Sequence, residues 1–185
     1  MARENKTKYA ILGLMAEKPV SGYDIKKAVE ESLGNFWSES YGQIYPVIKQ
    51  LTQEGFVRRE AIETREGKPA RHVYTITEKG REKLRSWLIE PAEPHRERVE
   101  VLLKLFFGNE VPVSENIKHL ERFREENSAL LEKYLTIEDC LKSEYGNETA
   151  LPYWLSTVRC GIKVSSAMIE WCNETIENLK GGFLE

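Results

Sequence analysis

The chain has 185 residues, 27 basic and 30 acidic side chains and a hydrophobic fraction of 41%, which is the composition of a globular protein with one domain or two small ones. Its apolar runs are only a few residues long, so we expect neither a membrane-spanning segment nor a signal peptide. Cys140, Cys160 and Cys172 form no C-x-x-C pair and leave an odd count, which favours a reduced, cytoplasmic protein.

The charge is divided unevenly between the two halves of the chain. Residues 1–90 contain 16 Lys and Arg against 13 Asp and Glu, a net charge of +3, whereas residues 91–185 contain 11 against 17, a net charge of −6. The basic first half suggests that this half has an anionic partner.

Two helices are predicted at the start of the chain. Residues 6–16 carry apolar side chains at helical spacing and stop before Pro19. Ser21 is a suitable N-cap for the second helix, and Asp24 completes a capping box with it. We expect this second helix to end at Gly34.

The stretch 40–57, SYGQIYPVIKQLTQEGFV, is predicted to be a helix with two different faces. One face carries aliphatic side chains at helical spacing and should contact a core: Ile44, Val47, Ile48 and Leu51. The opposite side carries polar groups and one cation: Tyr45, Lys49, Gln50 and Gln53. Such groups reach base edges and phosphate oxygens, and no carboxylate precedes Glu54, so this face suits DNA. By itself the pattern fits an ordinary solvated helix face equally well.

The ends of this helix are marked by Ser40, a suitable N-cap, and by Gly55, a residue suited to the position just beyond the last turn. Pro46 lacks the N–H group that would bond the carbonyl of Gly42. We therefore expect the helix either to begin near Gly42 or to bend there.

Beyond this helix the apolar spacing becomes strand-like. Residues 56–63 and 72–76 are predicted to pair as a β-hairpin, because the second run is rich in β-branched and aromatic side chains. Gly67 and Pro69 mark the turn between them. The turn carries three cations: Arg65, Lys68 and Arg71. A merely soluble basic loop is the alternative explanation of these cations.

A helix over residues 78–90, capped by Thr77, should follow the hairpin with three inward side chains: Leu84, Trp87 and Leu88. Three helices, a hairpin and a fourth helix form the layout of a winged helix-turn-helix domain, here residues 1–90. In that layout the third helix enters the major groove of DNA, and the hairpin, or wing, lies along the neighbouring backbone. Lys49 and the turn cations lie where this geometry requires positive charge.

The chain after the prolines of residues 90–95 is expected to be entirely helical, so the fold class is mainly α with one small hairpin. Three helices are predicted, over residues 96–107, 114–145 and 149–180. The first of them carries the apolar side chains Val99, Leu102, Leu103 and Phe106 and should end at Gly108. We interpret residues 91–185 as an all-α dimerisation domain.

The last helix has the most regular period in the chain. Alternating spacings of four and three run over four heptads, the pattern of a coiled-coil seam, with Ser165 among apolar residues. The residues predicted for dimerisation are Leu151, Leu155, Val158, Ile162, Ile169, Cys172, Ile176 and Leu179. The seam requires a partner surface, which the helix over 114–145, a second protomer or both could supply. A homodimer is the favoured hypothesis.

Three segments resemble the PadR family of bacterial transcriptional regulators: SGYDI at 21–25, YGQIYPVIKQLTQEGFV at 41–57 and GKPARHVYTITEKG at 67–80. The resemblance covers residues 6–90 in order and implies a homodimeric repressor or activator with a winged-helix head. The helical second half looks like that of the longer subgroup, whose C-terminal helices embrace the partner. The resemblance implies DNA contacts by Ser21 and Tyr23 at phosphates, by Tyr41, Gln43, Tyr45 and Lys49 in the groove, and by Lys68 and Arg71 on the wing.

No enzyme, metal or cofactor motif occurs in the sequence. It has no Gly-rich phosphate loop and no H-E-x-x-H, and its three histidines lie in different segments, so we expect neither an enzyme nor a bound cofactor. Six aromatic residues of the second half are explained either as core packing, which is favoured, or as the site of a small aromatic effector: Phe106, Phe107, Tyr134, Tyr153, Trp154 and Trp171.

Two functions remain to be compared. The favoured one is a homodimeric, sequence-specific transcriptional regulator, with repression preferred, that reads a pseudo-palindromic operator on double-stranded DNA. The alternative is a winged-helix module that binds a protein and no DNA. The outer face of the helix over 40–57 lacks the large apolar anchors of a protein-binding surface, which favours the first.

Overall fold

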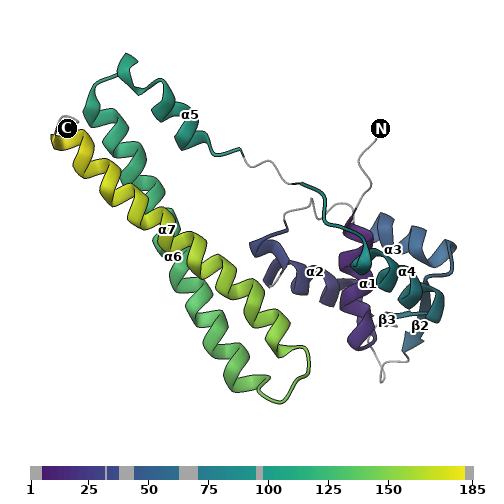
Figure 1. Ribbon diagram of the computed structural model, residues 1–185. Coiled ribbons are helices and arrows are strands. Elements are labelled where there is room, and N and C mark those ends of the chain that lie inside the picture. The colour runs from purple at the N-terminus through teal and green to yellow at the C-terminus, as the bar shows by residue number, and fades with distance from the viewer. Residues whose placement is uncertain (1–5, 32, 38–43, 63–70, 95–97, 182–185) are drawn as a thin grey trace. The chain divides into compact units, whose positions relative to one another are not determined.

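The computed structural model describes residues 6–31, 33–37, 44–62, 71–94 and 98–181. The chain divides into two compact units, Met1–Pro94 and His95–Glu185 (Figure 1). The first unit combines helices with a small sheet, and the second is helical.

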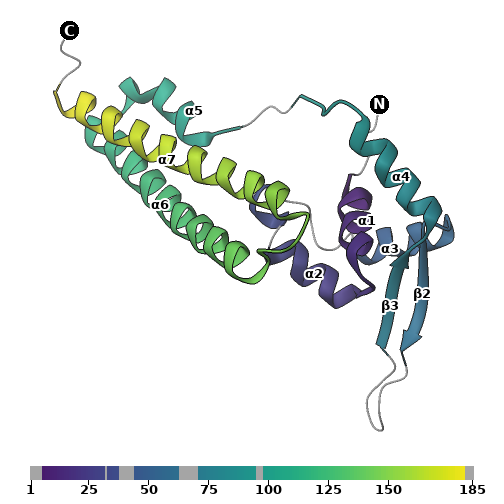
Figure 2. The same ribbon diagram turned by 60° about the horizontal axis from the view of Figure 1, so that its bottom comes forward.

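The first unit has the element order of a winged helix. Its elements are α1 (Thr7–Glu17), β1 (Val20–Ser21), α2 (Gly22–Glu31), the 3₁₀ helix η1 (Leu33–Asn35), α3 (Ile44–Gln53), β2 (Val57–Ile62), β3 (Arg71–Ile76) and α4 (Glu78–Ile89). Figure 2 shows the β2–β3 hairpin projecting from the helices, with α4 running back past α1. The predicted end of the second helix at Gly34 was slightly late, because Gly34 belongs to η1.

The sheet has a third strand that the sequence did not predict. β1 pairs antiparallel with β3, Val20 opposite Tyr74 and Ser21 opposite Val73, so the strand order is β1-β3-β2. Since α2 begins directly after β1, this pairing ties the start of α2 to the wing.

The core of the first unit forms between α1, the inner faces of α2 and α3, and the sheet. All four side chains predicted to line the inner face of α3 are buried, which confirms that prediction. The buried core residues are Tyr9, Ile11, Leu12, Met15, Val20, Ile25, Ile44, Val47, Ile48, Leu51, Val57 and Ile76. One apolar stripe of α3 is therefore fixed against the core, which leaves the opposite stripe outside.

The C-terminal end of α3 follows from its sequence. The described part of the helix begins at Ile44, and the predicted N-cap Ser40 and the predicted start or bend near Gly42 lie outside the described residues. At the other end Gly55 adopts a positive φ of 75°. The N–H of Phe56 donates to the carbonyl of Leu51 at 2.9 Å, and that of Gly55 to the carbonyl of Thr52 at 3.2 Å. This is a Schellman motif, which confirms the predicted role of Gly55.

α4 is capped as predicted, but only two of the three side chains that were predicted to face inward do so. The Thr77 hydroxyl accepts the N–H of Gly80 at 3.1 Å. Leu84 and Trp87 pack against the core, and the Trp87 ring stacks on Tyr9 with 4.4 Å between centroids. Leu88 is exposed, because one further residue turns the helix by about 100°, away from α1.

The second unit is built on two long antiparallel helices. Its elements are α5 (Glu100–Phe106), the 3₁₀ helix η3 (Gly108–Glu110), α6 (Val113–Glu144) and α7 (Leu151–Gly181). α6 and α7 lie side by side over most of their length (Figures 1 and 2). Within the described ranges, no helix combines the length and the hydrophobicity needed to cross a membrane.

The seam between α6 and α7 combines small and polar side chains with apolar ones. A Cβ atom on Gly161 of α7 would lie 2.5 Å from the Tyr134 ring of α6, so the helices approach closely there. Arg159 donates to Glu138 at 2.7 Å across the seam. Hydrogen bonds from Arg159 and Lys142 lower the pKa of the Glu138 carboxyl, which keeps this ion pair charged.

Only part of the apolar surface of α5 is buried. Val101 is buried, and Val99 and Leu105 pack near it, whereas Leu102, Leu103 and Phe106 are exposed. The helix has only seven residues and apolar side chains on several sides, so its period could not identify the buried face.

Candidate nucleic-acid interface

The outer face of α3 presents polar groups to solvent. Tyr45 is 59% exposed, and Lys49, Gln50 and Gln53 are exposed beside it. Gln50 donates from Nε2 to the Glu54 carboxylate at 2.7 Å. Lys49 has no ion pair or hydrogen bond with any residue that the structure describes, so its ammonium is available to an external anion.

The start of α2 lies against this face. A Cβ atom on Gly22 would come within 2.6 Å of the Tyr45 ring, so the Tyr45 side chain lies over the first turn of α2. Tyr23, one residue further on, is exposed. The two phenols thus belong to one continuous surface formed by α2 and α3.

Ser21 is used within the protein rather than presented to solvent. It is only 4% exposed, and its hydroxyl donates to the Asp24 carboxylate at 2.7 Å and accepts the Asp24 N–H at 3.2 Å. The N–H of Ser21 donates to the same carboxylate at 3.1 Å. This is the predicted capping box. The exposed Tyr23 is therefore better placed for the phosphate contact assigned to both residues.

The wing is a ladder of six residue pairs, from Val57 opposite Ile76 to Ile62 opposite Arg71. Arg71 belongs to the last pair of this ladder, next to the turn. The turn itself, residues 63–70, lies outside the described residues and includes the predicted contact Lys68. The predicted groove residues Tyr41 and Gln43 also lie outside them.

Three exposed wing residues were not assigned from the sequence: Arg58, Arg59 and His72. Arg58 is paired with Glu60 at 2.7 Å, so part of its charge is compensated. Two consecutive arginines, Arg58 and Arg59, at the start of a predicted strand could have identified this basic part of the wing from the sequence. Together with Lys49, these side chains place positive charge on both α3 and the wing strands.

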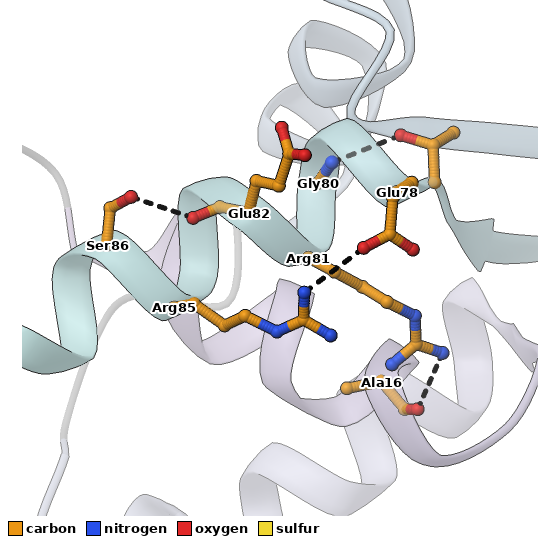
Figure 3. A network of polar contacts seen from close by, with 8 residues as sticks. Ala16, Glu78, Gly80, Arg81, Glu82, Arg85 and Ser86 are labelled. Carbon is orange, nitrogen blue, oxygen red and sulfur yellow. Dashed lines mark hydrogen bonds and ion pairs between the residues drawn. The ribbon is translucent and has the colours of Figure 1, made fainter.

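Figure 3 shows polar contacts of α4, one of which reaches α1. Arg81 donates from Nη2 to the carbonyl of Ala16 at 3.0 Å, which joins α4 to the end of α1. On the exposed side of the same helix, Arg85 pairs with Glu78 at 3.1 Å. α4, which follows the wing strand β3 directly, is therefore tied to α1.

The predicted dimerisation residues lie along the seam with α6 of the same chain. Cys172 and Ile176 are buried there and have no exposed surface left for a second protomer. The others are half-buried: Leu151, Leu155, Val158, Ile162, Ile169 and Leu179. α6 of the same chain, one of the partner surfaces left open by the sequence, thus covers Cys172 and Ile176, while the other six residues keep exposed surface.

Comparison with protein families assigns both units. The model of the transcriptional regulator PadR-like family matches residues 11–86, and that of the virulence activator alpha C-terminal family matches residues 97–180. The chain belongs to the PadR-like family. It is accordingly a member of a family of transcriptional regulators, and the resemblance seen in its sequence is confirmed.

Two relatives are similar to this PadR-like chain in sequence. The negative transcriptional regulator PadR of Bacillus subtilis is 43% identical over 102 residues, which span 54% of this chain and 55% of the relative. A probable transcriptional regulator of Mycobacterium tuberculosis is 26% identical over 186 residues, covering 93% of this chain and 96% of that one. The first match thus extends over only about half of either protein.

Solved PadR-like structures match nearly the whole chain. Bacillus subtilis PadR in complex with operator DNA superimposes with a TM-score of 0.83 at 28% identity, covering 95% of this chain and 99% of that chain. The same protein in complex with p-coumaric acid gives 0.77 at 27% identity, with the same coverage. The Vibrio cholerae virulence activator AphA gives 0.72 at 25% identity, covering 94% and 98%. The predicted fold class, a winged helix followed by a helical region, is confirmed.

Proposed function

We propose that this PadR-like chain is a homodimeric transcriptional repressor that binds a pseudo-palindromic operator on double-stranded DNA. The observation that carries the proposal is the division of α3 into a buried aliphatic face and an exposed polar face that includes Lys49. Tyr23 and the wing arginines extend that face towards the positions of neighbouring phosphates. The operator complex of the Bacillus subtilis relative supports DNA binding by a chain of this fold.

A second copy of the chain is the proposed partner of α5 and its surroundings. Six large apolar side chains within a dozen residues are exposed there, more than a monomer usually leaves in contact with water. We call them the α5 patch: Leu102, Leu103, Phe106, Phe107, Val111 and Val113. A two-fold dimer through the second unit would present two α3 helices to major grooves about one helical turn apart.

In-vitro selection of bound duplexes from a random pool tests this function. We expect a two-fold symmetric site, because two identical α3 helices would read its halves. We also expect the affinity to fall steeply with salt, because cationic side chains displace counterions from the phosphates. A pool without enrichment, together with an affinity that does not depend on salt, would exclude the proposal.

Replacing Lys49 by Ala should reduce operator affinity by about tenfold, the effect of losing one base contact. The affinity for unrelated DNA should fall much less, so the ratio of the two is the informative measurement. Lys83→Ala is a matched control, since it removes the same charge from α4. An equal loss of operator affinity in both variants would contradict a groove position for Lys49.

Replacing Arg71 by Ala should weaken binding to all duplexes alike, because a wing cation meets phosphates and not bases. Binding measured over a series of salt concentrations should give a slope lower by about one than that of the wild-type chain. A change in sequence preference without a change in slope would place Arg71 at a base instead.

A small aromatic acid is the proposed effector, with support from the p-coumaric acid complex of the Bacillus subtilis relative. Several of the aromatic residues named for this role pack inside the second unit. Tyr134 is buried in the seam, Trp171 meets Phe123 edge to face at 6.3 Å, and Trp154 meets Tyr145 at 5.8 Å. Core packing therefore accounts for these side chains, and an effector would contact the more exposed ones.

A further inference from the structure

The last turn of α3 is held by the first turn of α4, which lies more than twenty residues later in the chain. The Lys79 ammonium donates to the carbonyl of Glu54 at 2.8 Å. The Thr77 hydroxyl lies 2.8 Å from the carbonyl oxygen of Gly55, and the Thr77 N–H donates to the carbonyl of Phe56 at 3.0 Å. Three consecutive carbonyls at the end of α3 thus have partners from this one turn.

The last turn of α3 and the first turn of α4 are also tightly packed. A Cβ atom on Gly80 would lie 2.2 Å from the carbonyl oxygen of Phe56, a backbone atom that cannot move away cheaply. The Lys79 ammonium lies 4.8 Å from the centre of the Phe56 ring. We call Thr77, Lys79 and Gly80 the α3 clamp.

The α3 clamp lies where the orientation of α3 relative to the wing is determined. β2 begins at Val57, directly after the clamped residues, and β3 ends at Ile76, directly before Thr77. The exposed carbonyls at a helix C-terminus carry partial negative charge, which a nearby ammonium group stabilises. Lys79 is therefore the charged member of a junction between α3, both wing strands and α4.

We propose that Lys79 is a positioning residue for operator recognition, acting through the carbonyl of Glu54 and not through a contact to DNA. It fixes the end of α3 so that the polar face of the helix and the wing reach their grooves and phosphates together. The inference rests on the proposed DNA-binding function. A looser α3 would lose base contacts, which need exact placement, before it lost phosphate contacts, which many orientations allow.

Three variants of the full chain separate this role from others. Lys79→Met removes the donor and the charge but keeps an unbranched stem beside Phe56. Lys79→Arg restores a charged donor at the same place. Lys83→Met is the control, because it removes the same charge from the same helix, where the Lys83 ammonium lies near the Tyr9 ring at 5.9 Å and away from α3.

The measurements are affinities for the selected operator and for an unrelated duplex over a series of salt concentrations, with amide hydrogen exchange of the unbound proteins. Lys79→Met should weaken operator binding by about three- to tenfold, the effect of one charged hydrogen bond at an exposed site. Its affinity for unrelated DNA and its salt slope should match those of Lys83→Met. Amide exchange at residues 54–56 should become faster in Lys79→Met and not in Lys83→Met. Lys79→Arg should restore most of the operator affinity and most of the protection from exchange.

Three results would overturn the role. An equal loss on both duplexes with a salt slope lower by about one would make Lys79 a phosphate contact. An operator preference in Lys79→Met equal to that of Lys83→Met would show that the clamp does not affect recognition, although the wild-type chain binds DNA. A wild-type chain that binds no duplex at any salt concentration would overturn the proposed function, and this role with it.

Discussion

Replacing Ile48 by Ala should lower the free energy of unfolding of the first unit by about 2–5 kcal/mol, the usual cost of emptying a core position. Ile48 is 2% exposed and lies in the middle of the buried stripe of α3. Its loss removes apolar contacts and leaves a cavity that the rigid helix cannot fill. Since small domains are stable by only about 5–15 kcal/mol, this single change would remove much of the stability of the unit.

Hydrogen exchange resolved by residue is the suitable measurement, because the two units need not unfold together. Protection should fall in residues 6–94 and stay unchanged in residues 98–181. Gln53→Ala, on the exposed face of the same helix, is the control and should change stability by less than about 0.5 kcal/mol. Equal effects of the two substitutions would contradict the assignment of the buried face of α3.

Replacing Phe106 by Asp should dissociate the proposed dimer. Phe106 is 79% exposed in the protomer and stacks edge to face on Phe107, with 5.0 Å between ring centroids. Truncating an aromatic anchor at an interface typically costs about 2–4 kcal/mol, and a buried carboxylate adds its desolvation. We therefore expect the dissociation constant of the dimer to rise at least about thirtyfold. Operator binding should weaken with it, because a monomer reads only one half-site.

Sedimentation velocity over a range of micromolar concentrations measures this change. Tyr153→Asp is a matched control, since Tyr153 is also aromatic and 76% exposed but lies on α7, outside the α5 patch. The control should remain a dimer at concentrations where Phe106→Asp is a monomer. A wild-type chain that sediments as a monomer at every concentration, or a Phe106→Asp variant that dimerises normally, would exclude the α5 patch as the interface.

Local sequence determined most of the elements of this protein and the polar face of α3. The caps at Ser21 and Thr77 and the positive φ of Gly55 depend on residues a few positions apart, so each can be recognised from a short stretch. The buried stripe of α3 repeats at the helical period, and the residues between its members had to lie outside. The family resemblance and the candidate DNA-binding surface followed from the same short-range patterns.

Tertiary structure alone decided the features that depend on distant partners. β1 has two residues and no period, and exists through its pairing with β3. The heptads of α7 required a partner helix without identifying it, and within the chain α7 packs against α6. The buried face of α5 and the contact of Lys79 with Glu54 likewise depend on which surfaces meet after folding. Caps and periods act within a few residues, whereas pairing and packing act between residues that only the folded chain brings together.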